Sequence, residues 1–201
     1  ELLQKITLEK FKTVLERELI PLKSVKKWIR TFEEIFHEDR KYFSVIGVRV
    51  RTTNREVSSW DQPIVRQCDS GIVGFISKEI DGVLHFLVQL KMESGVMDLL
   101  EIAPTLQCIT DNYTLDAPLY TDLFIKKNSF ITIFNTYQSE EGGRFYRESN
   151  QNIILFSNTD FEEHTHSSYM WMTLWQLKKF IKFSNFVNIE ARSLLSSLKL
   201  S

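Results

Sequence analysis

A helix-like pattern of apolar positions lies between residues 24 and 36. Apolar side chains recur there at three- and four-residue spacing with charged residues between them, as on one face of an amphipathic helix. Ser24 is a suitable N-cap, and Pro21 marks a break just before it. The apolar positions are Val25, Trp28, Phe32, Ile35 and Phe36. We therefore expect the first forty residues to be helical.

From residue 43 the apolar period shortens to two, which is the spacing of a β-strand. Residues 43–51 alternate in this way, and short apolar runs follow, most of them bounded by Gly, Pro, Asn, Asp or Ser. The runs lie at residues 64–65, 72–76, 83–92, 100–110, 130–137 and 153–156. We expect each of them to form a strand.

Helical signals return near the C-terminus. Thr173 and Gln176 have the spacing of a capping box, in which each side chain satisfies a free backbone N–H of the first turn. Asn188 is a suitable cap for a last helix that carries Leu194, Leu195 and Leu198. Helices, then a long block of strands, then helices, with no regular βαβ alternation, predict an α+β fold with a mixed or antiparallel sheet.

One continuous domain is expected for most of the chain. Seven Gly and four Pro among 201 residues leave no flexible linker. We predict that residues 1–42 form a helical segment that packs on a single module of residues 43–201.

Charge and composition exclude some classes of function. The formal net charge of -1 argues against a general nucleic-acid or membrane-surface binder, which needs a basic surplus. No apolar run reaches the roughly 20 residues of a membrane span, and no signal peptide is evident, so we expect a cytoplasmic protein. Cys68 and Cys108, with no CxxC motif, indicate buried reduced thiols rather than a disulfide, although a disulfide between them stays possible.

The segment from residue 83 to residue 93 carries the most informative pattern. Its even positions are all apolar and predict a core face, whereas its odd positions include His85, Gln89, Lys91 and Glu93. A solvated outer face is the simplest interpretation of such a row. His and Gln are unusual on an outer strand, however, and this favours the wall of a binding pocket.

Further polar groups follow on the next predicted strand. Thr105 and Gln107 share one of its faces, and Asn112 and Tyr113 come after it. If the two strands are neighbours, their polar faces form one concave surface suited to a polyhydroxylated ligand.

Two arginines, Arg144 and Arg147, lie three residues apart after another strand. On a helical turn they would share a face and grip a diphosphate through charge-assisted hydrogen bonds. A solvated, salt-bridged helix is the alternative. Trp60 and Gln62 precede a proline, in either a ligand-facing loop or a packed strand entry, and no zinc or phosphate-loop signature is present.

Short motifs in a fixed order run from about Pro21 to Leu198. They are Trp60-Asp61-Gln62-Pro63, Gly82-Val83-Leu84-His85, Gln89-Leu90-Lys91-Met92-Glu93, Pro104-Thr105-Leu106-Gln107, Asn112-Tyr113, Gln138-Ser139-Glu140 with Gly142, Arg144-Phe145 and Asn150, Trp171 with Thr173-Leu174, and Val187-Asn188 with Ala191-Arg192-Ser193. Together they resemble the NDP-hexose 2,3-dehydratase family, which acts in deoxysugar biosynthesis. The resemblance implies a Nudix-like α+β module, a nucleoside-diphosphate sugar as ligand, and a dimer.

The sequence also departs from that family. Its members carry two modules in one chain, so we expect this single module to form a homodimer. Ser94-Gly95-Val96, Asp116-Ala117-Pro118, Glu141 and Ile189-Glu190 stand where the family has other residues. The run of glutamates that defines a Nudix hydrolase box is absent, which argues against pyrophosphate hydrolysis.

The implied reaction removes the C3 proton and the C2 hydroxyl of an NDP-4-keto-6-deoxyhexose, giving a 3,4-diketo-2,6-dideoxy sugar. It needs a base, an acid and a donor for the enolate oxygen, and it needs neither a cofactor nor a metal. Our hypothesis for the catalytic groups is His85 or Glu93 as base or acid, with Lys91 stabilising the enolate.

The remaining predicted residues bind the substrate. They are Trp60, Gln62, Gln89, Thr105, Gln107, Asn112, Tyr113, Gln138, Glu140, Arg144, Arg147, Asn188 and Arg192. Two alternatives stay open: a non-catalytic nucleotide-sugar-binding subunit, and a 4-keto sugar isomerase or epimerase that uses the same enolate.

Overall fold

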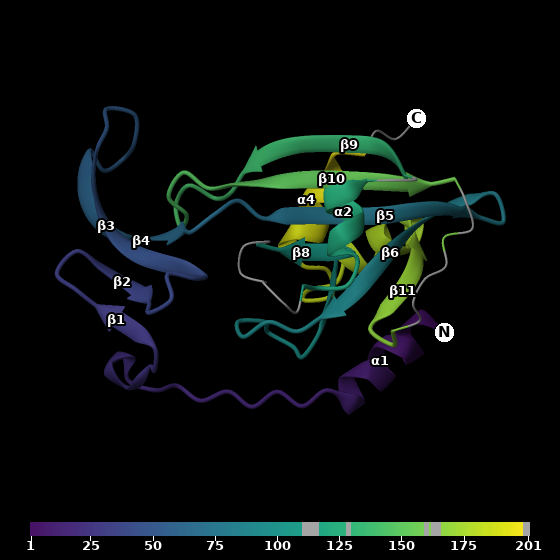
Figure 1. Cartoon of the computed structure of the whole chain (residues 1–201), viewed down its shortest axis with the longest axis horizontal. Helices are drawn as coiled ribbons and strands as arrows, with labels where there is room; N and C mark the ends of the chain where they lie inside the picture. The colour runs from purple at the N-terminus through teal and green to yellow at the C-terminus, as the bar shows by residue number, and fades with distance from the viewer. Residues whose placement is uncertain (110–116, 128–129, 159–160, 162–165, 199–201) are drawn as a thin grey trace.

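The computed structural model describes residues 1–109, 117–127, 130–158, 161 and 166–198, and it contains two β-sheets (Figure 1). The smaller sheet has the order β1-β2-β3-β4, with every neighbouring pair antiparallel. Its strands are β1 (Trp28–Arg30), β2 (Glu34–His37), β3 (Phe43–Arg51) and β4 (Ser59–Gln67).

The larger sheet has seven strands and forms the body of the molecule. Its main path is β11-β6-β5-β10-β9, with β7 paired to β6 and β8 paired to β5. Only the β5–β10 pair is parallel among these pairings, so the sheet is mixed. The strands are β5 (Ile72–Ile80), β6 (Val83–Lys91), β7 (Glu101–Ala103), β8 (Leu106–Cys108), β9 (Phe130–Ser139), β10 (Ser149–Ser157) and β11 (Tyr169–Thr173).

Helices cover both faces of the larger sheet, and each face has its own apolar core (Figure 1). One core takes side chains from three helices: α1 (Leu2–Lys12), α3 (Leu174–Ile181) and α4 (Ile189–Ser196). The other core is closed by Phe124 of the short helix α2 (Thr121–Lys126). The predicted α+β class with a mixed sheet and helices at both ends is confirmed.

The predicted helical segment of residues 1–42 is confirmed only at α1, and the helix expected over residues 24–36 is wrong. This segment forms a 3₁₀ turn at Leu22–Ser24 and then the hairpin of β1 and β2. Lys27 has a φ of 66°, which a helix cannot accommodate, and Thr31 Oγ1 accepts from the backbone N–H of Glu34 in the turn between the strands (3.1 Å). The spacing of Trp, Ile and Phe fits both periods over so short a stretch, and pairing of β2 with β3 decides for the strand.

The predicted strands after residue 43 are confirmed, except that the run expected at residues 100–110 forms two short strands, β7 and β8, with different partners. Both C-terminal caps are confirmed. Thr173 and Gln176 form the reciprocal bonds of a capping box, and the Asn188 side chain accepts from the backbone N–H of Ala191 (2.9 Å). The predicted boundary between residues 42 and 43 falls in the connection between the paired strands β2 and β3.

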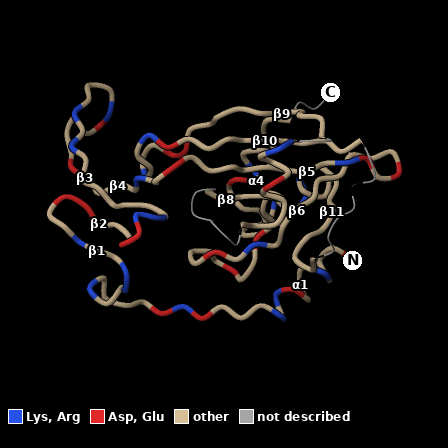
Figure 2. The backbone as a smooth tube through the Cα atoms, in the orientation of Figure 1, with Lys and Arg blue, Asp and Glu red and all other residues tan. Residues whose placement is uncertain are grey.

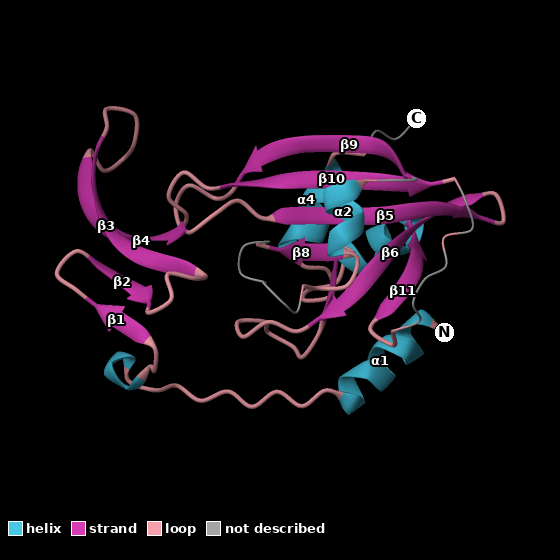
Figure 3. Ribbon diagram, viewed as in Figure 1, coloured by secondary structure: helices cyan, strands magenta, loops and turns pink. Residues whose placement is uncertain are grey.

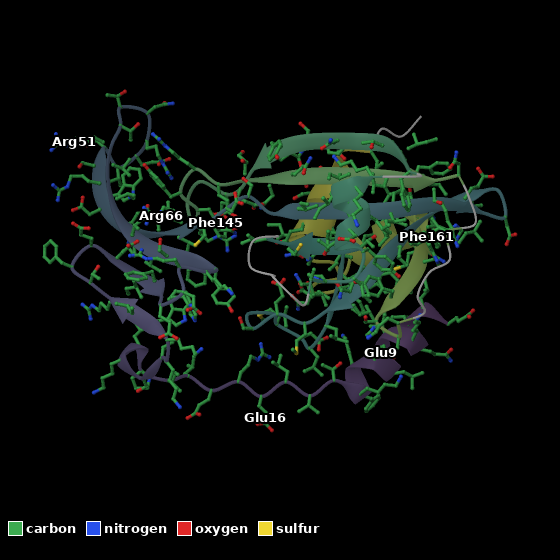
Figure 4. All side chains as sticks on the ribbon, in the orientation of Figure 1. Glu9, Glu16, Arg51, Arg66, Phe145 and Phe161 are labelled. Atoms are coloured by element: carbon green, nitrogen blue, oxygen red, sulfur yellow. The ribbon has the colours of Figure 1, made fainter. Side chains whose placement is uncertain are left out.

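Beyond the chain connection itself, the smaller sheet contacts the turn that follows β9. Val65 of β4 pairs with Phe145 through backbone bonds to Arg144 and Tyr146 (2.9 and 2.7 Å), and Phe145 lies at the junction in Figure 4. The smaller sheet therefore holds the turn at residues 140–148 in place.

No helix in the described part of the chain is long and apolar enough to cross a membrane. Both cysteines are free thiols; Cys108 is buried as expected, but Cys68 is exposed, because it lies just past the end of β4 between the two sheets.

Gly74 in β5 makes room for the α2 helix. A Cβ at this position would overlap the ring of the fully buried Phe124, at 2.7 Å from its Cζ. Gly74→Ala should therefore lower the free energy of unfolding by about 1–3 kcal/mol through overpacking, measured by urea denaturation.

Gly47→Ala in β3 is the matched control, since no atom lies within 4 Å of its added Cβ. We expect its effect to stay within about 0.5 kcal/mol. Equal effects of the two substitutions would contradict the packing of α2 on the sheet.

Candidate active-site cleft

An open cleft of about 970 Å³ lies at the edge of the larger sheet where β5 and β10 begin. Because these two strands are parallel, their amino-terminal ends lie at the same edge. Helix α4 and the end of β8 line the cleft, together with the end of β9 and the turn that follows it. Polar and charged lining residues include Lys91, Gln107, Gln138, Glu140, Glu141, Arg144, Glu148, Asn150, Asn152 and Glu190.

A buried hydrogen bond fixes the floor of this cleft. The backbone N–H of Gly71 donates to Asn150 Oδ1 (2.7 Å), and a Cβ on residue 71 would lie only 2.7 Å from that oxygen. Asn150 in turn donates from Nδ2 to Glu140 Oε1 (2.7 Å). The start of β5, the start of β10 and the end of β9 are thereby held in one arrangement.

Four predicted site residues form a single polar network, and two of them, Lys91 and Gln107, line the cleft. Lys91 Nζ lies 2.8 Å from Glu93 Oε1, which also accepts from Gln107 Nε2 (3.2 Å). Gln107 Oε1 accepts from Asn188 Nδ2 (2.8 Å), whose Oδ1 caps α4. The network therefore ties β6, β8 and α4 together around the Lys91 ammonium group.

Arg144 lines the cleft, but Arg147 does not share its face. The segment between them is a turn rather than the helical turn considered above, and Arg147 has a φ of 52°. The Arg147 guanidinium lies over the Tyr146 ring, whereas Arg144 pairs with Glu141 (2.5 Å). The structure thus separates the predicted arginine pair and leaves Arg144 as its cleft-facing member.

His85 lies at the opposite end of β6 from Lys91. Six residues of strand separate them, which is about 20 Å. The middle of the same face is occupied by Leu87, which is buried in the core closed by α2. The predicted polar row is therefore interrupted, and of its members only Lys91, which pairs with Glu93, lines the cleft. His85 does not belong to this site, and its Nδ1 lies 2.8 Å from its neighbour Val83 O.

Several other predicted binding residues lie away from the cleft wall. Thr105 is fully buried, and its hydroxyl is engaged by the Ile76 N–H and the Leu87 carbonyl, so it joins strands in the core. Gln89 pairs across the sheet with β7 and β11. Arg192 donates to the Asn188 carbonyl on α4 (3.3 Å).

The Trp60 and Gln62 side chains bond to each other and to the turn beside the cleft. Trp60 Nε1 donates to Gln62 Oε1 (2.7 Å), and Gln62 Nε2 donates to the Gly143 carbonyl (2.9 Å). They support the turn that carries Arg144. Asn112 and Tyr113 lie outside the described residues.

A second hollow, of about 770 Å³, lies between α1 and the β11–α3 corner. Its lining includes Trp171, Trp175 and Lys179 but none of the predicted site residues. Among the described residues no cluster of His, Cys, Asp and Glu is arranged to hold a metal ion.

A comparison with known protein families shows which family this chain belongs to. The model of the NDP-hexose 2,3-dehydratase family matches residues 1–198. The chain belongs to the NDP-hexose 2,3-dehydratase family. The family that the sequence resembles is therefore confirmed.

Curated members of the family are similar to this chain over almost all of its length. A dTDP-4-dehydro-6-deoxy-alpha-D-glucopyranose 2,3-dehydratase of Saccharopolyspora spinosa is 43% identical over 183 residues, covering 89% of this chain and 38% of the relative. The enzyme of the same name from Streptomyces violaceoruber is 40% identical over 188 residues, covering 92% and 42% respectively. The chain thus spans about two fifths of the length of these relatives.

Among solved structures, an ADP compounds hydrolase is similar with a TM-score of 0.45 and 13% identity, covering 77% of this chain and 83% of that one. A Caenorhabditis elegans Ap4A hydrolase has a TM-score of 0.39 and 13% identity, covering 66% and 94%.

The cleft of this family member also contains carboxyl groups that sequence reasoning missed. Burial raises the pKa of Glu148 to about 7, and the charge of Glu140 adds to the shift, while Asn150 opposes it. Burial likewise raises the pKa of Glu190, with Glu93 and Glu140 adding to it and the nearby Lys91 opposing it. Figure 2 shows residues of both signs interspersed along the backbone.

No sequence signal distinguishes these two glutamates. Glu148 stands in a turn rich in charged residues, where a solvated side chain is the ordinary expectation. Glu190 occupies the first turn of α4, where an acidic side chain is favoured by the helix dipole alone. The two glutamates become buried only because strands and a helix that are distant in sequence come together around the cleft.

The raised pKa of Glu148 predicts a specific pH dependence of stability. The folded state favours the protonated form, so the benefit is complete below the ordinary pKa of 4.5 and is lost as the pH rises through about 7. From pH 5 to pH 8, wild type should lose about 1–2 kcal/mol of stability relative to Glu148→Gln, less than the full shift because the Glu148 residue is only half-buried. Urea denaturation at both pH values measures this, with the exposed Glu79→Gln as control. Parallel pH profiles of wild type and Glu148→Gln would contradict the assignment.

Proposed function

We propose that this module is an NDP-4-keto-6-deoxyhexose 2,3-dehydratase whose substrate occupies the cleft between β5, β10 and α4. The observation that carries the proposal is the bonded network of Lys91, Glu93, Gln107 and Asn188, which supplies the ammonium and carboxyl groups that the family's reaction needs. Binding hydroxyls alone requires only amides and hydroxyls, whereas elimination requires an ammonium and carboxyl groups as well.

The elimination begins at the carbon next to the ketone. The C4 carbonyl acidifies the C3 hydrogen, and removal of that proton moves its bonding electrons toward the carbonyl oxygen as an enolate. The Lys91 ammonium is the group in the network that stabilises this developing negative charge. Return of the electrons expels the C2 hydroxyl as water, and the resulting enol tautomerises to the 3,4-diketo sugar.

Recognition of the nucleotide diphosphate is assigned to the turn after β9. Arg144 lines the cleft there, and the backbone bonds of the turn to Val65 of β4 hold it in place. A guanidinium forms paired, charge-assisted bonds with phosphate oxygens. Since the chain has a net charge of -1, local placement of this cation replaces a general attraction of the anionic ligand.

An assay of sugar mass tests this function against its two alternatives. Purified protein is incubated with dTDP-4-keto-6-deoxyglucose, and the product is followed by mass spectrometry and NMR. Loss of one water supports the proposal. An unchanged mass with an altered NMR spectrum identifies an isomerase or epimerase, and binding without any conversion identifies a sugar-binding subunit; either result contradicts the proposal.

Replacement of Lys91 should separate chemistry from binding. Lys91→Met should lower turnover about 10²–10³-fold, because the enolate loses its cationic donor, while dTDP binding measured by calorimetry changes little. Lys78→Met is the matched control, since Lys78 packs over Trp171 outside the cleft. His85→Asn should also retain turnover, and loss of activity in His85→Asn would place the reaction elsewhere on β6.

We also propose that two copies of the chain associate, as the family resemblance implies. Large apolar side chains are fully exposed on the N-terminal part, among them Leu19 (103%) and Phe32 (106%), at the extended segment and the hairpin that Figure 3 shows apart from the body. Sedimentation equilibrium should give a dimer that the double substitution Leu19→Asp and Phe32→Asp weakens at least tenfold. A fully active monomer would refute this.

A further inference from the structure

Glu148 is a carboxyl group that the protein buries beside the cleft and leaves unbonded. Neither of its two oxygens has a hydrogen-bond partner among the described residues, and both are shielded from solvent. Glu148 itself lines the cleft. Burial of a carboxyl group without a partner costs free energy, so natural proteins retain such groups chiefly where they have a use.

The other carboxyl groups around the cleft all have partners. Glu93 is held by Lys91 and Gln107, Glu140 by the Asn150 amide, Glu141 by Arg144, and Glu190 by its own backbone N–H. A carboxylate whose lone pairs already accept hydrogen bonds is a weaker base toward a substrate C–H bond. Among these five glutamates, Glu148 is the one whose two oxygens are both buried without a hydrogen bond of normal geometry in the described part of the chain.

Neighbouring hydrogen bonds fix the position of Glu148 in the turn between β9 and β10. Its backbone carbonyl accepts from the Glu140 N–H (3.0 Å), which joins the two sides of the turn between β9 and β10. The nearest amide donor, Asn150, is directed to Glu140 and to the floor of the cleft instead. The fold thus fixes the main chain of Glu148, while the Asn150 amide, which lowers the Glu148 pKa, is itself bonded to Glu140.

We propose that Glu148 is the catalytic base that removes the C3 proton of the 4-keto sugar. This inference rests on the proposed function of the cleft. The C3–H bond breaks, its proton forms an O–H bond with Glu148, and its electron pair forms the enolate at C3–C4. As the enolate collapses and the C2–O bond breaks, the hydroxyl departs with that proton as water, and the Glu148 carboxylate is restored without a further acid.

The raised pKa of Glu148 suits a group that first accepts and then returns a proton. A pKa of about 7 leaves the carboxylate partly ionised near neutral pH, and it makes the protonated form acidic enough to return its proton. Glu93, which the sequence suggested as base or acid, is instead placed to fix the position of the Lys91 ammonium.

The test uses a substrate analogue that can be deprotonated at C3 but cannot lose water, dTDP-4-keto-2,6-dideoxyglucose. In D₂O, wild type should exchange the C3 hydrogen for deuterium, which proton NMR follows. Glu148→Gln should slow this exchange and the dehydration of the full substrate by at least about 10²-fold, with dTDP binding unchanged. Glu79→Gln, an equivalent change at an exposed position on β5, should behave as wild type.

The possible outcomes test the role of Glu148 and the proposed function separately. If wild type dehydrates its substrate while Glu148→Gln still exchanges the C3 hydrogen at the wild-type rate, Glu148 is not the base and the proposed function survives. If wild type neither dehydrates the substrate nor exchanges the analogue, the proposed function fails and the role of Glu148 fails with it.

Discussion

The parallel pairing of β5 with β10 is the constraint on which the site depends. It brings two strands that are distant in sequence to begin at the same edge of the sheet, and the buried bond from Gly71 to Asn150 locks their starts together. The residues that line the cleft lie around this edge of the sheet. Asn150 also donates to Glu140, which holds the end of β9 beside the start of β10. Asn188 at the start of α4 donates to Gln107 of β8 and so joins that helix to the sheet.

The smaller sheet contributes to the site indirectly. Its strand β4 pairs with the turn after β9 at Val65 and Phe145, and Gln62 bonds the same turn at Gly143. This turn carries Arg144 and leads into Glu148. Trp60 and Gln62, which the sequence suggested as ligand contacts, hold the turn that lines the cleft.

Local patterns in the sequence predicted the strands and helix caps because period and capping depend on neighbouring residues. They failed at residues 24–36, where an apolar spacing compatible with a helix is overruled by pairing with β3. They predicted Lys91, Glu93, Gln107 and Asn188, which the structure joins in one network, and also His85, which lies at the other end of β6, because alternation gives the face of a strand and not what covers its middle. Glu148 was beyond reach, since its burial arises only when β9, β10 and α4 come together.

A crystal structure of Glu148→Gln with dTDP-4-keto-6-deoxyglucose tests the central claim most directly, because the substitution should hold the substrate unreacted. Our account predicts the hexose in the cleft, with C3 facing residue 148, the C4 oxygen toward Lys91 and the diphosphate at Arg144. Binding of the nucleotide sugar in the other hollow, between α1 and β11, with the cleft empty, would contradict it.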